Sequence, residues 1–200
     1  MPRPARYAKG VAKREEILTT ALAVIARTGY RRTSVRELAA AVGLSQAGLL
    51  HYFSSKEELF AELLRKRDEV DRANVAGPGV AAVDGLVDIV RHNAEVPGLV
   101  QLSARFTVEA SDPGHPAHDL VSARYDRLRA LFVEDIASRQ RAGALPAHLD
   151  PAVVANLLIA AADGLQTQFL LDPSLDMAEH LAALVSLLGS AAPPRAGEQE

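Results

Sequence analysis

The sequence has no cysteine and no tryptophan, and only 4% of its 200 residues are aromatic. Without cysteine there can be no disulfide and no thiolate catalysis, and a metal site would need His and carboxylate ligands alone. Apolar runs are short: the longest, residues 152–162, is interrupted by Asn156 and falls short of the roughly 18 to 20 residues of a membrane helix. The basic N-terminus lacks the apolar core of a signal peptide. We therefore expect a cytoplasmic protein with no membrane partner.

The residues that are abundant favour an all-α fold. Hydrophobic residues make up 48% of the chain and charged residues 24%, Ala and Leu are common, and few stretches alternate as strands do. A chain of 200 residues can bury one sizeable core or two modest ones. Apolar residues recur every three or four positions from residue 11 to 28 and predict the first helix there. We expect the preceding residues 1–10 to be a mobile arm.

Residues 34–53 predict two short helices joined at a glycine. Ser34 and Glu37 have the spacing of a capping box, in which each side chain satisfies a free backbone amide at the start of a helix. Gly43 can adopt the positive φ that ends this first helix, and Ser45 can cap the second. The order of these signals is that of a helix-turn-helix.

The second of these helices, expected over residues 46–52, has an outer face of small and polar side chains. Such a face fits the major groove of DNA, where Gln46 can hydrogen-bond adenine edges and Ala47 or Gly48 allows the backbone to come close. The Ser45 hydroxyl and the free amides at the start of this helix can bind phosphate. This segment is therefore our candidate recognition helix.

Positive charge is concentrated around the helix pair. Residues 1–53 contain nine Lys or Arg against three Glu, whereas residues 54–200 contain thirteen against twenty-two acidic residues. A basic end on an acidic protein indicates a local polyanion-binding surface, although a basic segment can also be merely solvated. Arg31 and Arg32 precede the helix pair and allow both interpretations. Lys56 stands in the first turn of the next helix, where the dipole disfavours a cation, so we expect a phosphate near it.

Ser55 and Glu58 again have capping-box spacing and predict a helix that runs to about Asp71. Just before it, Tyr52 is either a packing residue or a phosphate contact, and His51 could also reach a phosphate. The residues that we predict to contact DNA are Arg31, Arg32, Thr33, Ser34, Ser45, Gln46, Ala47, Gly48, His51, Tyr52 and Lys56.

This pattern resembles the TetR family of bacterial transcriptional regulators over about residues 11–64. The motifs that carry the resemblance are Gly29-Tyr30, residues 33–39 (TSVRELA), residues 42–45 (VGLS), Leu49, residues 51–53 (HYF) and residues 55–59 (SKEEL). The resemblance implies an all-α fold, in which a three-helix DNA-binding domain is joined to a larger helical ligand-binding and dimerisation domain. It also implies a repressor that binds a palindromic operator as a homodimer and is released by a small molecule.

Two positions depart from the family pattern. The family often has Gly where Ala47 stands and an aromatic residue where Leu50 stands, so a phosphate contact made by that aromatic residue cannot be transferred to this chain. Ser45, Tyr52 and Lys56 match the family, and the resemblance implies phosphate contacts for all three.

The rest of the chain is divided by composition. The division that we predict is an arm with the helix-turn-helix over residues 1–54, a connecting helix over 55–75, a ligand-binding and dimerisation domain over 76–190 and a disordered tail over 191–200. The stretch NVAGPG, residues 74–79, marks the break between the DNA-binding part and the remainder.

Two late segments predict a dimer interface. Pro151 opens a helix that is apolar around most of its circumference, and a second apolar stripe repeats at intervals of four, three and four residues. Pairing both with their symmetry mates would form a four-helix bundle; the alternative is two internal helices of a monomer. The predicted interface residues are Val153, Val154, Leu157, Leu158, Ala161, Leu165, Met177, Leu181, Leu184 and Leu188.

We expect a small apolar or amphipathic effector inside the larger domain. The candidate apolar and amide wall residues are Leu102, Phe106, Tyr125, Leu128, Phe132, Leu157 and Gln166. The candidate polar anchors are His92, Arg105 and Asn156. For each of them an ordinary core or surface role is the alternative.

Signals of catalysis are weak. His115 and His118 are three residues apart, but Pro116 and the loop around them indicate a helix entrance, and no third metal ligand is evident. We therefore expect no cofactor and no enzymatic activity. The rival hypothesis is an all-helical small-molecule-binding protein or enzyme whose basic N-terminus is incidental, and turnover without DNA binding would favour it.

Overall fold

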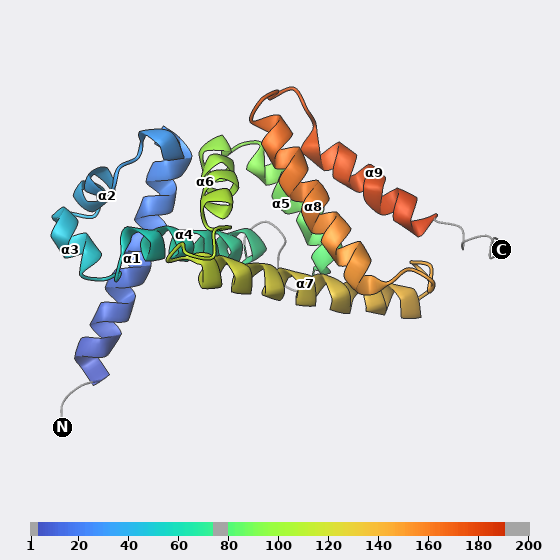
Figure 1. The fold of residues 1–200 in the computed structure, drawn as a ribbon, viewed down its shortest axis with the longest axis horizontal. Helices are drawn as coiled ribbons and strands as arrows, with labels where there is room; N and C mark the ends of the chain where they lie inside the picture. The colour runs from blue at the N-terminus through green and yellow to red at the C-terminus, as the bar shows by residue number, and fades with distance from the viewer. Residues whose placement is uncertain (1–3, 74–79, 191–200) are drawn as a thin grey trace. The chain divides into compact units, whose positions relative to one another are not determined.

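The computed structural model describes residues 4–73 and 80–190, and within these ranges the chain forms helices, turns and loops (Figure 1). Their elements are α1 (Pro4–Thr28), the 3-10 helix η1 (Tyr30–Arg32), α2 (Val35–Ala41), α3 (Gln46–Leu50), α4 (Lys56–Asp71), α5 (Ala82–Asn93), α6 (Pro97–Glu109), α7 (His118–Arg141), α8 (Pro151–Phe169) and α9 (Met177–Gly189). The all-α prediction is confirmed. The predicted break at residues 74–79 and the predicted tail at 191–200 lie outside the described residues.

The chain divides into two compact units. Unit 1 comprises residues 1–74 and 95–124, and unit 2 comprises residues 75–94 and 125–200. Helices α1 to α4, α6 and the first turns of α7 therefore belong to unit 1, and α5, the rest of α7, α8 and α9 to unit 2. This division by packing places α6 with the N-terminal helices, whereas the predicted division by function assigned α6 to the ligand-binding domain; the functional division remains a prediction.

Helix α1 begins earlier than its apolar periodicity indicated. The helix starts at Pro4, so residues 4–10, which we expected to be a mobile arm, form its first turns. Proline is favoured at the first helical position because its ring presets φ and its missing amide would have no partner there. The apolar pattern starts only where α1 meets other helices, and for this reason it did not mark the true start.

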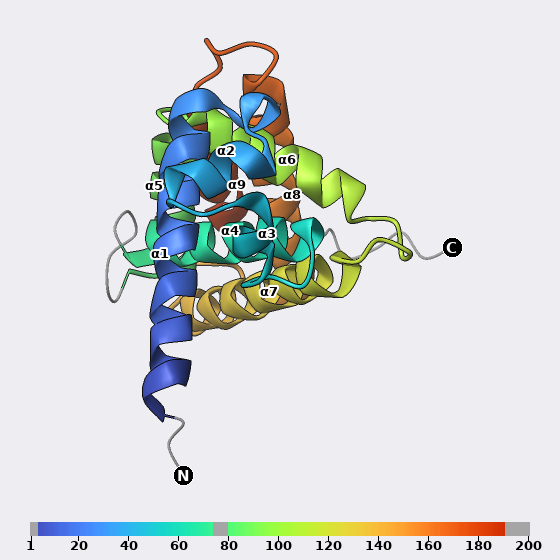
Figure 2. The ribbon, with the colours of Figure 1, turned by 90° about the vertical axis from the view of Figure 1, so that its left-hand side faces the viewer.

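The core of unit 1 forms around α1, which packs against α2, α4 and α6 (Figure 2). The side chains that are fully or almost fully buried there include Ile17, Leu18, Ile25, Leu38, Leu49, Phe53, Leu59, Leu63, Leu102 and Phe106. Burial of each such side chain contributes about 1.5 to 3 kcal/mol. Helices as short as α2 and α3 depend on this packing, because isolated helices of their length are unstable in water.

A glycine contact joins α6 to the end of α1. A Cβ atom on Gly98 would lie 2.3 Å from the Ile25 carbonyl oxygen and 3.0 Å from the Gly29 Cα, so this position in α6 admits no larger residue. Gly29 itself has φ of 81°, a backbone conformation that favours glycine, and it turns the chain from α1 into η1. Helix α6 thus supports the backbone immediately before Arg31 and Arg32.

In unit 2, α5, α8 and α9 pack on one another (Figure 1). The core that they share with α7 and the connection after it contains Val83, Val90, Phe132, Ile136, Leu145, Val154, Ala155, Leu158, Ile159, Ala162, Phe169, Met177 and Leu181. Although α8 is strongly apolar, none of the helices in the described residues combines the length and hydrophobicity needed to cross a membrane.

Candidate functional site

The capping box that opens α2 is formed as predicted. The Ser34 hydroxyl accepts a hydrogen bond from the Glu37 backbone N–H at 3.2 Å, and the Glu37 carboxylate accepts one from the Ser34 N–H at 2.6 Å. Gly43 ends the helix segment with φ of 69°. The direction in which the chain enters the next helix is therefore fixed by local hydrogen bonds and by a glycine conformation.

Helix α3 is capped by Ser45, whose hydroxyl accepts a hydrogen bond from the Gly48 N–H at 3.0 Å. Leu49 is fully buried and holds the helix against the core, while Gln46 and Ala47 are exposed. The helix ends at Leu50, two residues earlier than predicted, because the chain turns there toward α4. The exposed face of α3 is small and polar, as a helix that enters the major groove requires.

The predicted DNA contacts are not equally accessible. Arg31, Arg32, Ser34, Ser45, Gln46, Ala47, His51 and Lys56 are exposed, and Gly48 and Tyr52 are half-buried. Thr33, in contrast, is only 8% exposed. Its hydroxyl donates to the Gly29 carbonyl oxygen at 2.8 Å and lies 2.8 Å from the Thr28 hydroxyl. Because these bonds build the turn around η1, we exclude the Thr33 side chain from the proposed DNA contacts.

The cations of unit 1 differ in whether they form ion pairs. Arg65 and Lys66 on α4 form ion pairs, at 3.0 Å with Glu62 and at 2.7 Å with Glu15. Among the basic side chains without a carboxylate within 4.0 Å in residues 4–73 and 80–190, four belong to the segment from η1 to the start of α4, and the sequence analysis missed one of these four. These four are Arg31, Arg32, Arg36 and Lys56.

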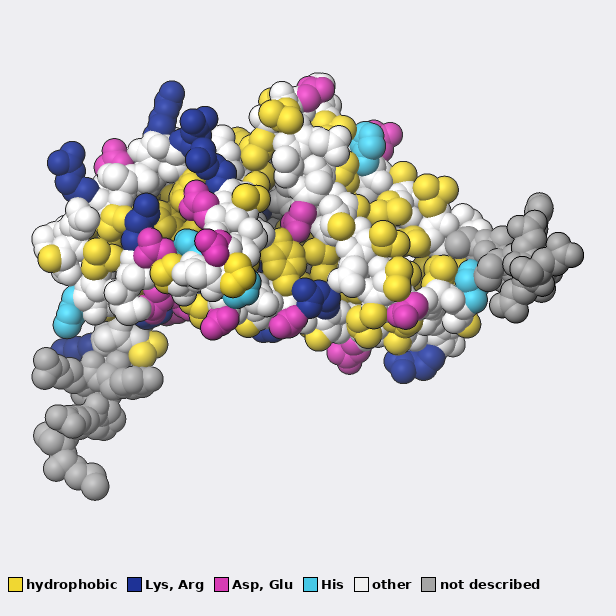
Figure 3. All heavy atoms as spheres, in the orientation of Figure 1, with side chains coloured by type: hydrophobic (Ala, Val, Ile, Leu, Met, Phe, Trp, Pro, Cys, Tyr) yellow, Lys and Arg dark blue, Asp and Glu magenta, His cyan; other side chains and the backbone are white. Residues whose placement is uncertain are grey.

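Arg36 is the missed member of this group. It is exposed on the first turn of α2, two residues after the capping serine, and its place in the helix-turn-helix motif was the available signal. Figure 3 shows Lys and Arg side chains gathered over α2 and the end of α1. The Lys56 ammonium also lies 5.7 Å from the centroid of the Phe60 ring. A cation over an aromatic ring is attracted to it, so this contact favours a Lys56 side chain that lies along the protein. An anion at this surface would meet cations that no carboxylate neutralises.

The cap of α4 differs from the predicted capping box. The Ser55 hydroxyl accepts from the Glu58 N–H at 3.0 Å as expected, but the Glu58 carboxylate accepts from the Ser54 N–H at 2.6 Å and from the Ser54 hydroxyl instead of returning to Ser55. The same carboxylate accepts from Arg14 at 2.7 Å. Partial burial alone would raise the pKa of Glu58, but the hydrogen bonds from Ser54 and Arg14 outweigh burial and lower this pKa.

The predicted effector residues are divided between the units. Leu102 and Phe106 are buried in the core of unit 1, and Arg105 is exposed there. In unit 2, Phe132 is buried, and His92, Tyr125, Leu128 and Gln166 are half-buried. The remaining two, Asn156 and Leu157, are exposed on α8.

A polar cluster in unit 2 contains two of these candidates and two residues that the sequence analysis missed. The Tyr125 hydroxyl donates to the Asp163 carboxylate at 2.8 Å, and the Asn93 amide donates to the Gln166 side-chain oxygen at 3.3 Å. Asp163 and Gln166 are one turn apart on α8. Polar side chains on the inner part of an apolar helix were the signal that could have identified Asp163.

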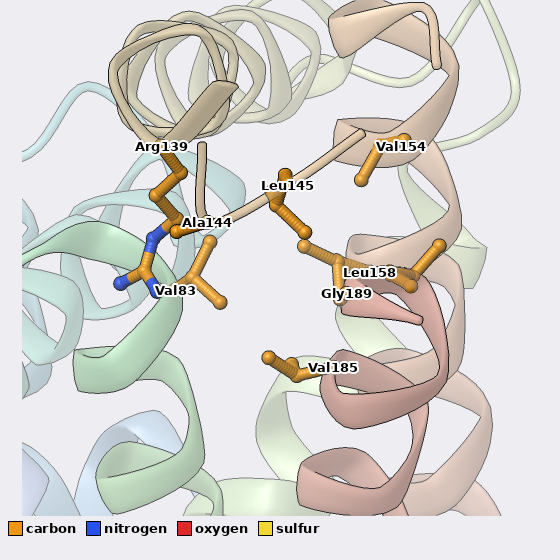
Figure 4. A pocket seen from close by; sticks show the side chains of 9 residues that line it. Val83, Arg139, Ala144, Leu145, Val154, Leu158, Val185 and Gly189 are labelled. Carbon is orange, nitrogen blue, oxygen red and sulfur yellow. The ribbon is translucent and has the colours of Figure 1, made fainter. Parts of the chain in front are cut away.

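A small cavity lies elsewhere in unit 2 (Figure 4). Its volume is about 60 Å³, and it is lined by Val83, Arg139, Ala144, Leu145, Val154, Leu158, Val185, Leu188 and Gly189. Ligand pockets usually have about 300 to 1,000 Å³, so this cavity is too small for an ordinary effector. None of the predicted effector residues lines it.

The predicted dimer residues lie on two different faces of α8 and α9. Val154, Leu158, Met177 and Leu181 are at most 2% exposed and pack inside unit 2. Ala161, Leu165, Leu184 and Leu188 are half-buried against the same core. The apolar side chains that point outward are Val153 and Leu157 on α8, at 54% and 51% exposure, and Leu187 on α9 at 68%. The stripe from Met177 to Leu188 therefore packs against its own chain, because its spacing follows the inner face of α9.

The two histidines before α7 are used within their own loop. His115 Nδ1 accepts a hydrogen bond from the Ala117 N–H at 3.2 Å, and its ring packs edge-on against Phe106 with centroids 5.7 Å apart. His118 Nδ1 lies 3.0 Å from the Ala110 carbonyl oxygen. These contacts place both side chains in the connection between α6 and α7, which agrees with the predicted helix entrance.

A capped helix, a glycine turn and a short exposed second helix among unpaired cations define this chain as a helix-turn-helix protein. Comparison with known proteins identifies its family. Residues 17–63 match the model for bacterial regulatory proteins of the tetR family, and residues 102–189 match the model for the C-terminal part of BetI-type transcriptional repressors. Together the two models cover about two thirds of the chain, and the chain belongs to the TetR family.

Individual relatives support this assignment. The chain is 40% identical over 79 residues to the transcriptional repressor AcnR of Corynebacterium diphtheriae, a match that covers 40% of this chain and 38% of AcnR. It is 30% identical over 128 residues to the repressor Rv1474c of Mycobacterium tuberculosis, covering 59% of this chain and 65% of that protein. The matches thus span less than two thirds of the length of either relative.

Solved structures share the fold. A TetR-family regulator from a Rhodococcus species superposes with a TM-score of 0.70 at 21% identity, over 88% of this chain and 97% of that one. A regulator from Saccharomonospora viridis in complex with choline has a TM-score of 0.61 at 26% identity, over 88% of this chain and 93% of that one. The matched proteins are named as transcriptional regulators or repressors.

Proposed function

We propose that this protein is a transcriptional repressor that binds a palindromic DNA operator as a homodimer and is released from it by a small molecule. The observation that carries the proposal is the set of unpaired cations in the segment that contains α2 and α3: Arg31 and Arg32 in η1, Arg36 on α2 and Lys56 at the start of α4. Phosphate contacts from such cations supply most of the affinity of a protein for DNA, and they position the side chains that read bases.

Within this proposal Gln46 reads bases and the cations hold the backbone. Gln46 is exposed on the first turn of α3, from which its amide can form two hydrogen bonds to adenine in the major groove. Ser45, Tyr52 and Lys56 contact phosphates on either side of that helix. Their assignment is supported by the match of this segment to the tetR-family model over residues 17–63.

The homodimer forms through the outer faces of α8 and α9. Val153, Leu157 and Leu187 are large apolar side chains that are more than half exposed, and Figure 3 shows apolar side chains gathered over these two helices. A palindromic operator presents two half-sites, about one helical turn of DNA apart, to two recognition helices of a symmetric dimer. Pairing of these apolar faces would give the symmetric dimer that such an operator requires.

We propose that the effector carries a cationic group and binds at the polar cluster of unit 2. A carboxylate beside an aromatic ring, as in Asp163 and Tyr125, suits an organic cation. The similar regulator from Saccharomonospora viridis was solved with choline. Isothermal titration with choline tests this, and substitution of Asp163 by Asn should abolish binding. Binding of anionic candidates alone would refute a cationic effector.

Release follows from linked equilibria. If the effector binds more tightly to a conformation in which α4 is displaced, occupancy of its site favours that conformation and DNA affinity falls. Helix α4 carries Lys56 at its start, and Arg124 of α7 holds Asp68 of α4 with two hydrogen bonds, at 2.6 and 2.9 Å. Displacement of α4 would therefore move a phosphate contact directly.

Selection of bound sequences from random DNA tests the proposed function. A palindromic consensus is expected, with binding that weakens steeply with salt. Substitution of Gln46 by Ala should then weaken binding to the consensus more than to random DNA, because a lost base contact costs about 1 to 3 kcal/mol of discrimination. Equal losses on both DNAs would contradict its assignment as a base reader, and failure to enrich any sequence would contradict DNA recognition itself.

A further inference from the structure

Arg14 of α1 is the residue in unit 1 whose contacts converge on the turn between α3 and α4. One of its guanidinium nitrogens, Nη1, donates to the Tyr52 carbonyl oxygen at 2.5 Å. The other, Nη2, donates to Glu58 at 2.7 Å and lies 3.7 Å from Glu62. The guanidinium also stacks over the Phe53 ring, 4.3 Å from its centroid.

These contacts meet where backbone carbonyl groups lack hydrogen-bond partners within a helix. Helix α3 has five residues, and the last carbonyls of any helix have no partner within the helix. Arg14 supplies a donor to the Tyr52 carbonyl oxygen just beyond the end of α3. Because Phe53 is 1% exposed, the guanidinium is stacked on a fixed ring, and the planar fork of arginine can bind both neighbours at once.

The contacts extend through Glu58 to the start of α4. While one carboxylate oxygen of Glu58 accepts from Arg14, the other accepts from the Ser54 backbone N–H at 2.6 Å. The two phosphate contacts of the proposed function are attached to this arrangement. Tyr52 is held through its own carbonyl oxygen. Lys56 lies between Ser55, whose hydroxyl accepts from the Glu58 backbone N–H at 3.0 Å, and Glu58 itself.

We propose that Arg14 is a positioning residue for DNA binding: it fixes the turn between α3 and α4 to α1, so that Tyr52 and Lys56 reach the DNA backbone beside the recognition helix. Arg14 acts through these residues and not as a DNA contact, because its donors are directed to groups within the protein. This inference rests on the proposed function. Arg14 and Tyr52 are 38 residues apart in the sequence, so this contact exists only in the folded chain.

Lys13 offers a matched control. It carries the same charge on the same helix, and its ammonium pairs with Glu16 of α1 at 2.7 Å, away from the turn. Replacement of either residue by Gln removes one positive charge from α1. A difference between Arg14→Gln and Lys13→Gln therefore measures the contacts of Arg14 and not its charge.

The experiment measures dissociation constants by fluorescence anisotropy on an enriched operator duplex, from low to moderate salt. Arg14→Gln should weaken binding about tenfold or more. It should also lower the slope of log affinity against log salt concentration, the salt slope, by about 0.9, the value for one lost phosphate contact. Lys13→Gln should change affinity less than about twofold, as expected for an exposed ion pair. Equal losses for the two variants would overturn the proposal.

A double-mutant cycle with Lys56→Ala separates positioning from an independent contribution. If Arg14 positions Lys56, Arg14→Gln should weaken binding less in the Lys56→Ala background than in the wild type. Fold-losses that simply multiply would overturn the proposal. A role in stability alone would not produce this dependence on Lys56 or the change in salt slope.

Circular dichroism and thermal unfolding establish that each variant is folded. Arg14→Lys keeps the charge next to Glu58 but lacks the fork that reaches the Tyr52 carbonyl oxygen and Glu58 together, and it replaces Arg14→Gln if that variant is unfolded. Wild-type affinity of Arg14→Lys would then overturn the proposal. Wild-type protein is measured first, and if it fails to bind any duplex, the proposed function fails and not this inference alone.

Discussion

Unit 1 and unit 2 both pack around an apolar core, and in unit 1 hydrogen bonds from Arg14 also tie the turn after α3 to a distant helix. In unit 1, helix ends are fixed by directional hydrogen bonds, such as those of Ser34, Ser45 and Glu58, and by the guanidinium of Arg14. In unit 2 the shared core of α5, α7, α8 and α9 is almost entirely apolar. Directional bonds hold side chains at fixed angles, as the reading of DNA requires, whereas apolar packing tolerates exchange of similar side chains.

The two units also differ in the side chains that they expose. Unit 1 exposes cations without carboxylate partners among its described residues, and unit 2 exposes apolar side chains on α8 and α9. Under the proposed function the first surface meets phosphates and the second meets its own copy. The following substitutions test whether this contrast governs stability, assembly and binding.

The largest effect is expected at Arg67 of α4, the one Arg or Lys side chain that is buried among the described residues. It is 4% exposed, donates to the Leu99 carbonyl oxygen at 2.9 Å and lies 3.4 Å from Asp71. Arg67→Ala should lower the free energy of unfolding by about 3 to 5 kcal/mol, because it removes one partner of a buried pair. Urea unfolding measures this, with Arg31→Ala as an exposed control that should change stability by less than about 0.5 kcal/mol. Similar losses for the two would contradict the contrast between buried and exposed cations.

In unit 2 the corresponding test is a charge on the outer face of α8. Leu157→Asp should raise the dimer dissociation constant about tenfold or more, because a carboxylate would be desolvated in the apolar interface. Sedimentation equilibrium measures the change. Val108 of α6 is also exposed, at 71%, and Val108→Asp should leave assembly unaltered. A wild-type protein that is monomeric at micromolar concentration would contradict the dimer.

A smaller effect is expected from removal of one unpaired cation at the proposed DNA surface. Lys56→Ala should weaken binding to all DNA sequences and reduce the salt slope by about 0.9, because one phosphate contact is lost. Arg65, on the same helix, is paired with Glu62 at 3.0 Å, so Arg65→Ala should alter the slope less. Equal changes in the salt slope would contradict the expectation that a cation without an ion pair contributes more to DNA binding than one with an ion pair.

The smallest effect concerns acid stability. Because the pKa of Glu58 is lowered in the folded chain, this group contributes stability above its ordinary pKa, and the contribution is lost as the pH falls through the lowered value. As the pH falls below the ordinary pKa of a glutamate, wild-type protein should therefore lose stability more steeply than Glu58→Gln. Urea unfolding at several pH values measures the slopes, and Glu57→Gln is the neighbouring control. Parallel slopes for wild type and Glu58→Gln would contradict the role of this carboxylate.

Local signals were sufficient for the helix-turn-helix. The capping residues Ser34 and Ser45 and the turn at Gly43 act within three or four residues of chain, so their geometry follows from spacing alone. The same locality explains one error. Glu58 was expected to bond back to Ser55, but Arg14, 44 residues away, holds its carboxylate, and sequence spacing carries no information on such a contact.

Helix faces were predicted less well than helices. The stripe from Met177 to Leu188 has the spacing of a packed face, yet periodicity does not state whether the partner is the same chain or a second copy. The structure places Met177 and Leu181 in the core of unit 2 and leaves Val153, Leu157 and Leu187 exposed. The polar cluster of Asn93, Tyr125, Asp163 and Gln166 joins three helices, and only their packing brings those side chains together.

By itself the sequence determined the all-α fold, the two short capped helices α2 and α3 and the family resemblance, because caps, turns and amphipathic periods act over a few residues. The tertiary structure decided which cations lack partners, which face of α8 is free and what holds the turn after α3. Those features depend on residues that are distant in the chain, such as Arg14 and Glu58, and their contacts exist only when the helices pack.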